Sequence, residues 1–307
     1  MMRAFLTGVA ALVLSGASAG CTTMGAHTAE PAAIVTQSVP ETMASLDPAD
    51  SILFWSAERR SAAFRDMEGL FPGLEAAQTG PVRELPRGTP LDAETMAAAR
   101  AFMAQTGAAG LMVLRDGKIA FQEYALGFRP DERWTSFSVA KSFTSTLLGA
   151  AIADGAIAGV DQLVTDIIPA LAGTAYDGVT VGQIATMTSG VRWNEDYTDP
   201  NSDVAKMLAV TPVPGESQAI TYARTLTREA PAGEKWVYKT LETNLLGLIV
   251  EEATGRSLAD YAGEKIARPA GFVGKLFWMQ DLTGGNIAGC CISLRLSDYA
   301  RFGQFVL

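Results

Sequence analysis

The chain has 307 residues, with 24 Lys and Arg against 33 Asp and Glu, and a formal net charge of −9. This acidic balance argues against nucleic acid as a partner, because a nucleic-acid surface needs clustered Lys and Arg to neutralise phosphates. A chain of this length can bury a large core in one domain or in two interleaved ones, so disorder is not the default.

The first twenty residues have the pattern of an export signal. Arg3 supplies the positive start, Phe5 to Leu14 form an apolar run, and small residues around Ala19 suit a cleavage site. Since that run is too short to cross a bilayer as a mature helix, we expect residues 1–20 to be removed on export to the periplasm.

Cys21 follows Ser18-Ala19-Gly20, and this segment resembles a bacterial lipobox, in which a lipidated Cys becomes the new N-terminus. The resemblance predicts a membrane-anchored lipoprotein. Ser18 stands where Leu is usual, so ordinary cleavage near Ala19, which would release a soluble periplasmic form, is the alternative. Residues 21–48 are rich in Ala, Thr, Pro and Ser without a sustained hydrophobic period and are expected to form a tether.

Strand and helix signals follow the tether. Residues 110–124 predict a β-hairpin, since Asp116-Gly117 between two apolar segments readily adopts the positive φ of a tight turn. From Ser138 to Ala153 small and apolar residues run without a breaker, which predicts a buried helix with Ser138 at its N-terminus. We expect few strands past residue 126. Further helices are expected over residues 181–188, 241–254 and 257–267.

Two scarce residue types limit the chemistry. The single histidine, His27, lies in the predicted tether, so neither a Ser-His-Asp triad nor a His-rich zinc site is expected, and no metal or cofactor is predicted. Besides Cys21, the chain has only the neighbours Cys290 and Cys291. Adjacent cysteines rarely form a disulfide because the linkage is strained, so we expect these two to be small buried hydrophobes.

Ser138-Val139-Ala140-Lys141 is the only Ser-x-x-Lys in the sequence. Residues three apart on a helix face the same way, so the Lys141 amine can reach the Ser138 hydroxyl. At a helix N-terminus the free N–H groups also favour a developing alkoxide or oxyanion. The apolar neighbours Val139, Phe143 and Leu147 would favour the uncharged amine that a base requires. This spacing indicates a serine nucleophile activated by lysine.

The flanks of this motif, residues 134–144, closely resemble the nucleophile segment of class C β-lactamase-like serine hydrolases. About one hundred residues on, Pro231-Ala232-Gly233-Glu234-Lys235-Trp236-Val237-Tyr238 resembles the second motif of that family. The resemblance implies that Tyr238 shuttles protons between Ser138, Lys141 and the leaving group. The alternative is a buried aromatic side chain that packs at a helix start.

A third segment, Met187 to Val204, resembles the 6-aminohexanoate-dimer (nylon oligomer) hydrolase branch of the family. The resemblance implies that Tyr197 lies at the substrate pocket. Glu195, Asp196 and Asp199 could contact an amine, but a solvated acidic loop is at least as good an interpretation. Two residues after Tyr238, where β-lactamases typically carry Asn, this chain has Thr240, whose hydroxyl is our second candidate substrate contact.

The resemblance runs from about residue 90 to Leu307. It implies an α+β fold of the β-lactamase/penicillin-binding transpeptidase type, with an antiparallel sheet flanked by helices and a mostly helical insertion. Residues 49–155 would form the N-terminal part with the nucleophile helix, 156–285 the insertion, and 286–307 the return toward the sheet. Family members continue to a strand with a Lys-Thr-Gly or His-x-Gly motif that completes the site. No such motif follows the insertion here, so we expect the C-terminal part of the fold to be missing.

These features predict an exported serine hydrolase that forms an acyl-enzyme on Ser138. Its expected partner is a small-molecule amide or ester, either a 6-aminohexanoate oligomer or a short ester. One alternative is a β-lactamase or D-Ala-D-Ala peptidase, which would use the same nucleophile. Another is a non-catalytic sensor of the penicillin-binding type, which the missing third motif favours.

Overall fold

The structure is a computed structural model that describes residues 52, 55–76 and 79–307. The predicted export signal and tether, including Cys21 and His27, lie outside the described residues. Within the described ranges, no helix is long and apolar enough to cross a membrane. Nor does this part of the chain bring together three or more His, Cys, Asp or Glu side chains that could hold a metal ion.

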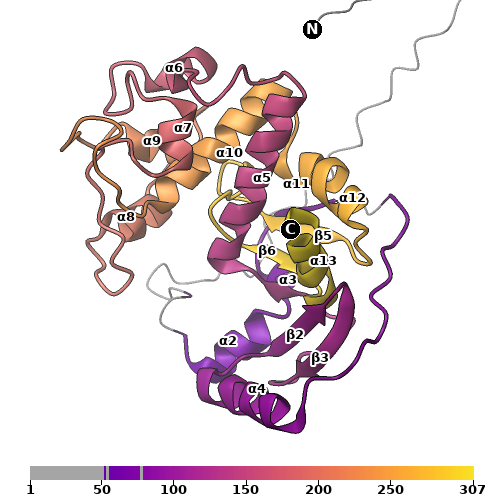
Figure 1. Ribbon diagram of the computed structural model, residues 1–307. Coiled ribbons are helices and arrows are strands. Elements are labelled where there is room, and N and C mark those ends of the chain that lie inside the picture. Colours follow the sequence, from indigo (N-terminus) through magenta and orange to yellow (C-terminus); the bar gives the residue numbers. More distant parts are fainter. Residues whose placement is uncertain (1–51, 53–54, 77–78) are drawn as a thin grey trace, which may run out of the picture. The chain divides into compact units, whose positions relative to one another are not determined.

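Strands from both ends of the described chain meet in one antiparallel sheet of order β1-β5-β6-β4 (Figure 1). β1 and β4 precede the helical region of the sequence, and β5 and β6 follow it. The sheet can therefore form only when the helical region folds so that β5 and β6 come to lie beside β1 and β4. The strands are β1 (Gly73–Ala76), β4 (Trp134–Thr135), β5 (Leu276–Met279) and β6 (Ile292–Leu294).

The predicted hairpin is confirmed as a separate two-stranded sheet, β2 (Gly110–Arg115) and β3 (Lys118–Tyr124). Arg115 pairs with Lys118, which leaves the two-residue turn Asp116-Gly117. Both turn residues have positive φ, 51° and 72°, as a turn of this kind requires.

The predicted helices are confirmed, with some ends shifted. α5 (Ala140–Ala153) and α10 (Thr240–Thr254) match their predicted spans closely, and α10 ends at Gly255 in the left-handed conformation. α7 (Val181–Ala185) ends early, because Met187 has a left-handed backbone with φ of 57°. The other helices are α2 (Ala57–Ala63), α3 (Met67–Leu70), α4 (Ala93–Thr106), α6 (Val164–Ile167), α8 (Asp203–Ala209), α9 (Gln218–Ala223), α11 (Leu258–Ala262), α12 (Arg268–Ala270) and α13 (Leu296–Val306), with short turns η2 (Phe137–Val139), η3 (Pro169–Leu171) and η4 (Gly263–Ala267).

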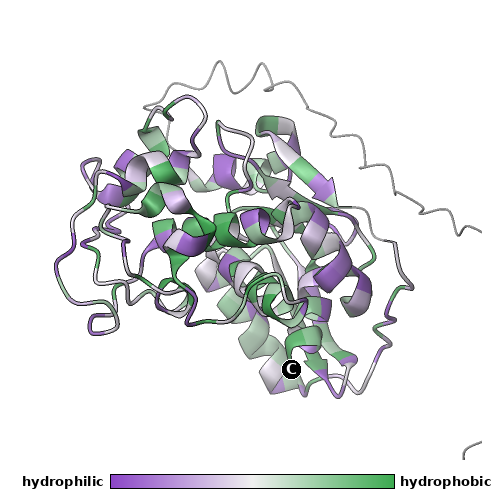
Figure 2. Cartoon of the chain, turned by 90° about the horizontal axis from the view of Figure 1, so that it is seen from above, coloured by the Kyte–Doolittle hydropathy of each residue, from purple (hydrophilic) through white to green (hydrophobic). Residues whose placement is uncertain are grey.

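The core is centred on α5 and α10, which pack side by side (Figure 1). Leu147 of α5 and Leu245 and Ile249 of α10 are fully buried, and burial of each such side chain stabilises the fold by about 1.5–3 kcal/mol. Figure 2 shows strongly hydrophobic residues on helices in the middle of the view. Phe143 stacks on Phe302 of α13 with ring centroids 3.8 Å apart, so the last helix covers the nucleophile helix.

Two residues of α13, Asp298 and Tyr299, bind neighbouring parts of the chain. Buried Asp298 accepts hydrogen bonds from the backbone N–H groups of Val273 and Gly274, at 2.8 and 2.9 Å. The hydroxyl of Tyr299 lies 2.8 Å from the carbonyl oxygen of Trp134 in β4 and 3.1 Å from that of Ile292 in β6. This helix therefore holds both strands beside the nucleophile segment.

Beyond residue 126 the structure has three short strands, β4, β5 and β6, so the expectation of few strands there holds, but their positions were not predicted from the sequence. β5 reads Leu-Phe-Trp-Met, and all four of these residues are buried. A short strand buried on both faces has no alternation of polar and apolar residues, so its sequence cannot be distinguished from a piece of buried helix.

The expectation that Cys290 and Cys291 form no disulfide is wrong, because the structure joins them in one. Cys291 has a left-handed backbone with φ of 72°. This local departure from ordinary backbone geometry was not foreseen from the sequence. Cys291 is buried, as expected, whereas Cys290 is only partly buried.

Glu251 in α10 makes the stability of the fold depend on pH. Its carboxylate accepts a hydrogen bond of 2.9 Å from the N–H of Leu258, and burial raises the pKa of Glu251 from 4.5 to about 7. The folded state therefore binds this proton more tightly than the unfolded state does. The free energy of unfolding should fall as the pH rises from about 4.5 to about 7, and the contribution should be constant above that range.

Glu251→Gln should make this part of the profile less steep, because Gln keeps an acceptor oxygen for Leu258 but carries no titrating proton. Glu242, whose pKa burial also raises to about 7, should still contribute. Urea unfolding across this pH range measures the effect, with Glu94→Gln, an exposed carboxyl in α4, as the control. An unchanged slope in Glu251→Gln would show that another group causes the dependence.

Candidate active site

Ser138 lies where a strand turns into the nucleophile helix. The N–H of Ser136 donates to the carbonyl of Ile292 at 2.7 Å, and the N–H of Ile292 donates to Ser136 Oγ at 3.1 Å, which extends the pairing of β4 with β6. Ser138 then stands in the turn η2, directly before α5, and its side chain is exposed. We expected it at the first position of an α-helix. The structure places it in the preceding 3₁₀ turn.

Phe137, directly before Ser138, has a left-handed backbone with φ of 43°. Non-glycine residues seldom adopt this conformation, and in proteins it is concentrated at functional sites. Its ring packs edge-on against Phe64 with centroids 4.9 Å apart. This contact helps to hold the turn that presents Ser138 to solvent.

The side-chain nitrogen of Lys141 is surrounded by three oxygen atoms. Nζ lies 3.3 Å from Ser138 Oγ, 3.2 Å from Thr240 Oγ1 and 2.8 Å from the carbonyl oxygen of Gly289. The predicted contact between the lysine and the serine one turn earlier is present.

The segment Ala288-Gly289 lies between α5 and α10 and contacts both. Thr144 Oγ1 of α5 donates to the carbonyl of Ala288 at 2.8 Å, and the N–H of Gly289 donates to Oδ1 of Asn244 in α10 at 2.8 Å. A Cβ atom at position 289 would lie 3.0 Å from side-chain atoms of both Asn244 and Thr240. Glycine at position 289 therefore lets α10 approach this part of the backbone closely.

Tyr238 lies beside Lys141, with its ring centroid 5.1 Å from Nζ. Among the described residues, its hydroxyl makes no hydrogen bond to Ser138 or Lys141. Its segment is held by backbone bonds from Val237 N to Met187 O at 3.2 Å and from Gly233 N to Thr188 O at 2.7 Å. The two segments that resemble family motifs are therefore neighbours in space.

A buried ion pair lies next to Tyr238 in the sequence. Lys239 Nζ is 3.5 Å from the carboxylate of Glu242, and both side chains are fully buried. Ser189 Oγ donates a hydrogen bond to the same carboxylate. Burial raises the pKa of Glu242 to about 7, while the charge of Lys239 opposes this shift. Removing one partner would leave the other charge buried and uncompensated, so the pair holds the start of α10 in place.

Tyr197 approaches the same group of side chains from the loop after α7. Its hydroxyl donates to Glu195 Oε1 at 2.5 Å and lies 3.3 Å from Thr240 Oγ1. Partial burial and the hydrogen bond to Glu195 both raise the pKa of Tyr197 above its ordinary value. The side chain is 40% exposed, so it remains accessible from solvent.

The solvated-loop interpretation fits two of the three acidic residues in this loop. Asp196 and Asp199 are bonded within their own turns, to Thr198 and Asn201. It is wrong for Glu195, which is partly buried and bonded to Thr240 and Tyr197.

The structure thus brings together all five predicted site residues: Ser138, Lys141, Tyr197, Tyr238 and Thr240. The sequence analysis missed Gly289, Asn244 and the role of Glu195. Asn244 lies one helical turn after Thr240, and this spacing could have indicated it. Val139 was expected to help bury Lys141, but it is 51% exposed and does not.

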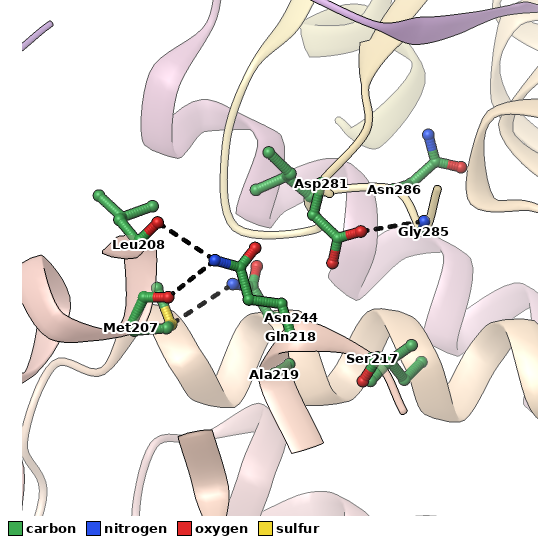
Figure 3. Close-up of a pocket in the computed structure, with 11 residues that line it drawn as sticks. Met207, Leu208, Ser217, Gln218, Ala219, Asn244, Asp281, Gly285 and Asn286 are labelled. Atoms are coloured by element: carbon green, nitrogen blue, oxygen red, sulfur yellow. Dashed lines mark hydrogen bonds between the residues drawn. The ribbon is translucent and has the colours of Figure 1, made fainter. Parts of the chain in front are cut away.

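On the other side of Asn244 lies a small cavity of about 30 Å³ (Figure 3). The Gln218 amide donates to the carbonyls of Met207 and Leu208, at 3.0 and 3.2 Å, and Asp281 accepts from the N–H of Gly285 at 3.2 Å. This space, which has a mainly apolar lining, is too small for an aminohexanoate chain.

Comparisons with known proteins agree with this geometry. The family model described as Beta-lactamase matches residues 96–274, more than half of the chain. The 6-aminohexanoate-dimer hydrolase of Paenarthrobacter ureafaciens is 33% identical over 205 residues, which are 64% of this chain and 51% of that protein. The chain therefore spans about half the length of this curated relative.

Solved structures share the fold. A Bacillus anthracis protein assigned as a 6-aminohexanoate-dimer hydrolase superposes with a TM-score of 0.70 at 18% identity, over 80% of this chain and 68% of that one. A class C beta-lactamase superposes with a TM-score of 0.53 at 20% identity, over 71% and 66% of the two chains.

The geometry predicts that Ser138 is the residue labelled by a fluorophosphonate probe, because it is exposed and within reach of the Lys141 amine. Peptide mass mapping should locate the label on Ser138, and Ser138→Ala should abolish it. Ser142→Ala, an exposed serine one turn further along α5, should label normally. Undiminished labelling of Ser138→Ala would contradict the assignment.

Proposed function

The chain belongs to the beta-lactamase family, and on this premise we propose that it hydrolyses amides or esters of small carboxylic acids through an acyl-enzyme on Ser138. The observation that carries the proposal is the position of Lys141, whose nitrogen lies 3.3 Å from Ser138 Oγ. A serine hydroxyl is a weak nucleophile until a neighbouring base takes its proton. Lys141 is the only amine that the described hydrogen bonds bring to this hydroxyl.

The reaction would proceed in two steps. Ser138 Oγ attacks the substrate carbonyl as its proton passes to Nζ of Lys141, and a tetrahedral oxyanion forms. The leaving amine or alcohol departs with a proton returned through Lys141 or Tyr238, which leaves an ester on Ser138. A water molecule then gives up a proton to the same groups and attacks this ester. The bond to Ser138 Oγ breaks, the proton returns to Oγ, and the acid is released. The start of α5 favours the negative charge that develops in both steps.

Tyr238 is the proposed proton shuttle. Its ring lies against Lys141, which places Tyr238 beside the amine with which it would exchange protons. Catalytic hydrogen bonds are often incomplete before substrate binds, so the missing bond in the free protein is compatible with this role.

The surroundings of Thr240 favour esters and linear amides over β-lactams. Thr240 offers one hydroxyl where β-lactamases typically carry an amide, and that hydroxyl is already bonded to Lys141 and Glu195. Exposed apolar side chains flank the site, since Val139 and Trp236 are 51% and 64% exposed. We therefore propose short acyl esters and 6-aminohexanoate amides as substrates. The name of the curated relative refers to the second of these classes.

Tyr238→Phe should keep the fold and lower kcat by about 10²-fold or more, as expected when a positioned acid–base group is removed. The measurement is steady-state hydrolysis of a short p-nitrophenyl ester, with circular dichroism to check the fold. Tyr124→Phe in β3 removes a hydroxyl bonded only to Gln122 and should leave kcat unchanged. Near-normal turnover in Tyr238→Phe would give Tyr238 a packing role.

Substrate preference tests the substrate class. We expect kcat/KM to be highest for a short acyl p-nitrophenyl ester, which has the best leaving group, lower for a linear aminohexanoate dimer, and lowest for a chromogenic cephalosporin. A clear preference for the cephalosporin would favour a β-lactamase. A burst of one product per protein molecule without further turnover would instead indicate a sensor that is acylated but not regenerated.

A further inference from the structure

The carboxylate of Glu195 is surrounded by hydrogen-bond donors. Oε2 accepts from the backbone N–H of Thr240 at 3.0 Å and from the indole N–H of Trp193. Oε1 accepts from the hydroxyls of Tyr197, at 2.5 Å, and of Thr240. An ionised carboxylate only accepts and has room for about four such bonds. Both hydroxyls therefore donate their single hydrogen to Glu195.

The bond from Thr240 to Glu195 determines which group donates in the hydrogen bond between Thr240 and Lys141. With its proton directed at Glu195, Thr240 Oγ1 can offer only a lone pair to Lys141 Nζ, 3.2 Å away. The carbonyl of Gly289, 2.8 Å from Nζ, can also only accept. Two of the three partners of Lys141 thus require an N–H from it.

A neutral amine has two N–H groups and one lone pair. If Thr240 and Gly289 take the two N–H groups, the lone pair faces the third partner, Ser138 Oγ, at 3.3 Å. We propose that Glu195 is a positioning residue that acts through Thr240 to aim the lone pair of neutral Lys141 at the Ser138 hydroxyl. The inference rests on the proposed function, in which Lys141 takes the Ser138 proton.

The loop that carries Glu195 is anchored well enough for this task. Trp193 is 7% exposed and packs edge-on against Tyr222, with ring centroids 6.1 Å apart. The N–H of Asn194 donates to Asp203 of α8 at 2.7 Å. The carboxylate is therefore held from the core side as well as by its bonds to Thr240.

Glu195→Gln tests the inference without changing the size of the side chain. The side facing Thr240 N–H and Trp193 N–H must remain an oxygen, because both of those groups are obligatory donors. The new NH₂ group then faces the hydroxyls, so Thr240 accepts from it and its freed proton points toward Lys141. The lone pair of Lys141 would then be drawn to Thr240 and away from Ser138.

The expected result is a fall of about 10-fold to 100-fold in kcat and in the rate of fluorophosphonate labelling of Ser138, with KM little changed. Thr240→Val removes the hydroxyl that carries the effect, so adding Glu195→Gln to Thr240→Val should cause no further loss. Asp196→Asn, the same charge change at the next residue, should behave as wild type. Thermal unfolding of each variant shows whether the fold is kept.

Three outcomes would overturn the inference while leaving the proposed function intact: wild-type labelling and kcat in Glu195→Gln; full additivity with Thr240→Val; or a rise in KM confined to substrates that carry an ammonium group, which would indicate direct substrate contact. Failure of the wild-type protein to label at Ser138 would instead contradict the proposed function itself.

Discussion

The backbone of Gly289 connects the parts of the chain that form the candidate site. Its carbonyl accepts from Lys141 of α5, and its N–H donates to Asn244 of α10. Three residues later, Ile292 of β6 pairs with Ser136, just before the nucleophile. Because one short segment contacts both helices and the sheet, the distance between Ser138 and Thr240 depends on it. Because position 289 has no side chain, α10 can approach the backbone there closely.

Buried polar groups surround an exposed nucleophile. Lys239 and Glu242 lie fully buried as an ion pair at the start of α10, whereas Ser138 and Tyr197 remain accessible to solvent. Ser189 also donates to Oε1 of Glu242, but Oε2 of Glu242 has no hydrogen-bond partner among the described residues. The charged pair is thus buried at the start of α10, while the proposed reacting groups lie at the surface.

Membership of the beta-lactamase family describes the scaffold and the nucleophile, and it leaves the substrate open, since one fold supports many functions. The groups that distinguish this chain lie around Thr240, where a hydroxyl replaces the amide typical of β-lactamases. Glu195 and Lys141 both engage that hydroxyl. In the proposed mechanism, substrate choice would be linked to the same hydrogen bonds that orient Lys141 as the base.

The sequence by itself determined the features that depend on neighbours along the chain. These are the hairpin with its Asp116-Gly117 turn, helices α5 and α10, and the reach of Lys141 to Ser138 one turn away. Turn chemistry and helical periodicity are local, so a single sequence expresses them. Resemblance to a family added Tyr238, Tyr197 and Thr240. Only the tertiary structure decided the pairing of β1 with β5, the bonds of Glu195 and the contact of Gly289 with Lys141. Hydrogen-bond partners distant in sequence leave no periodic pattern, because they exist only once the core has packed.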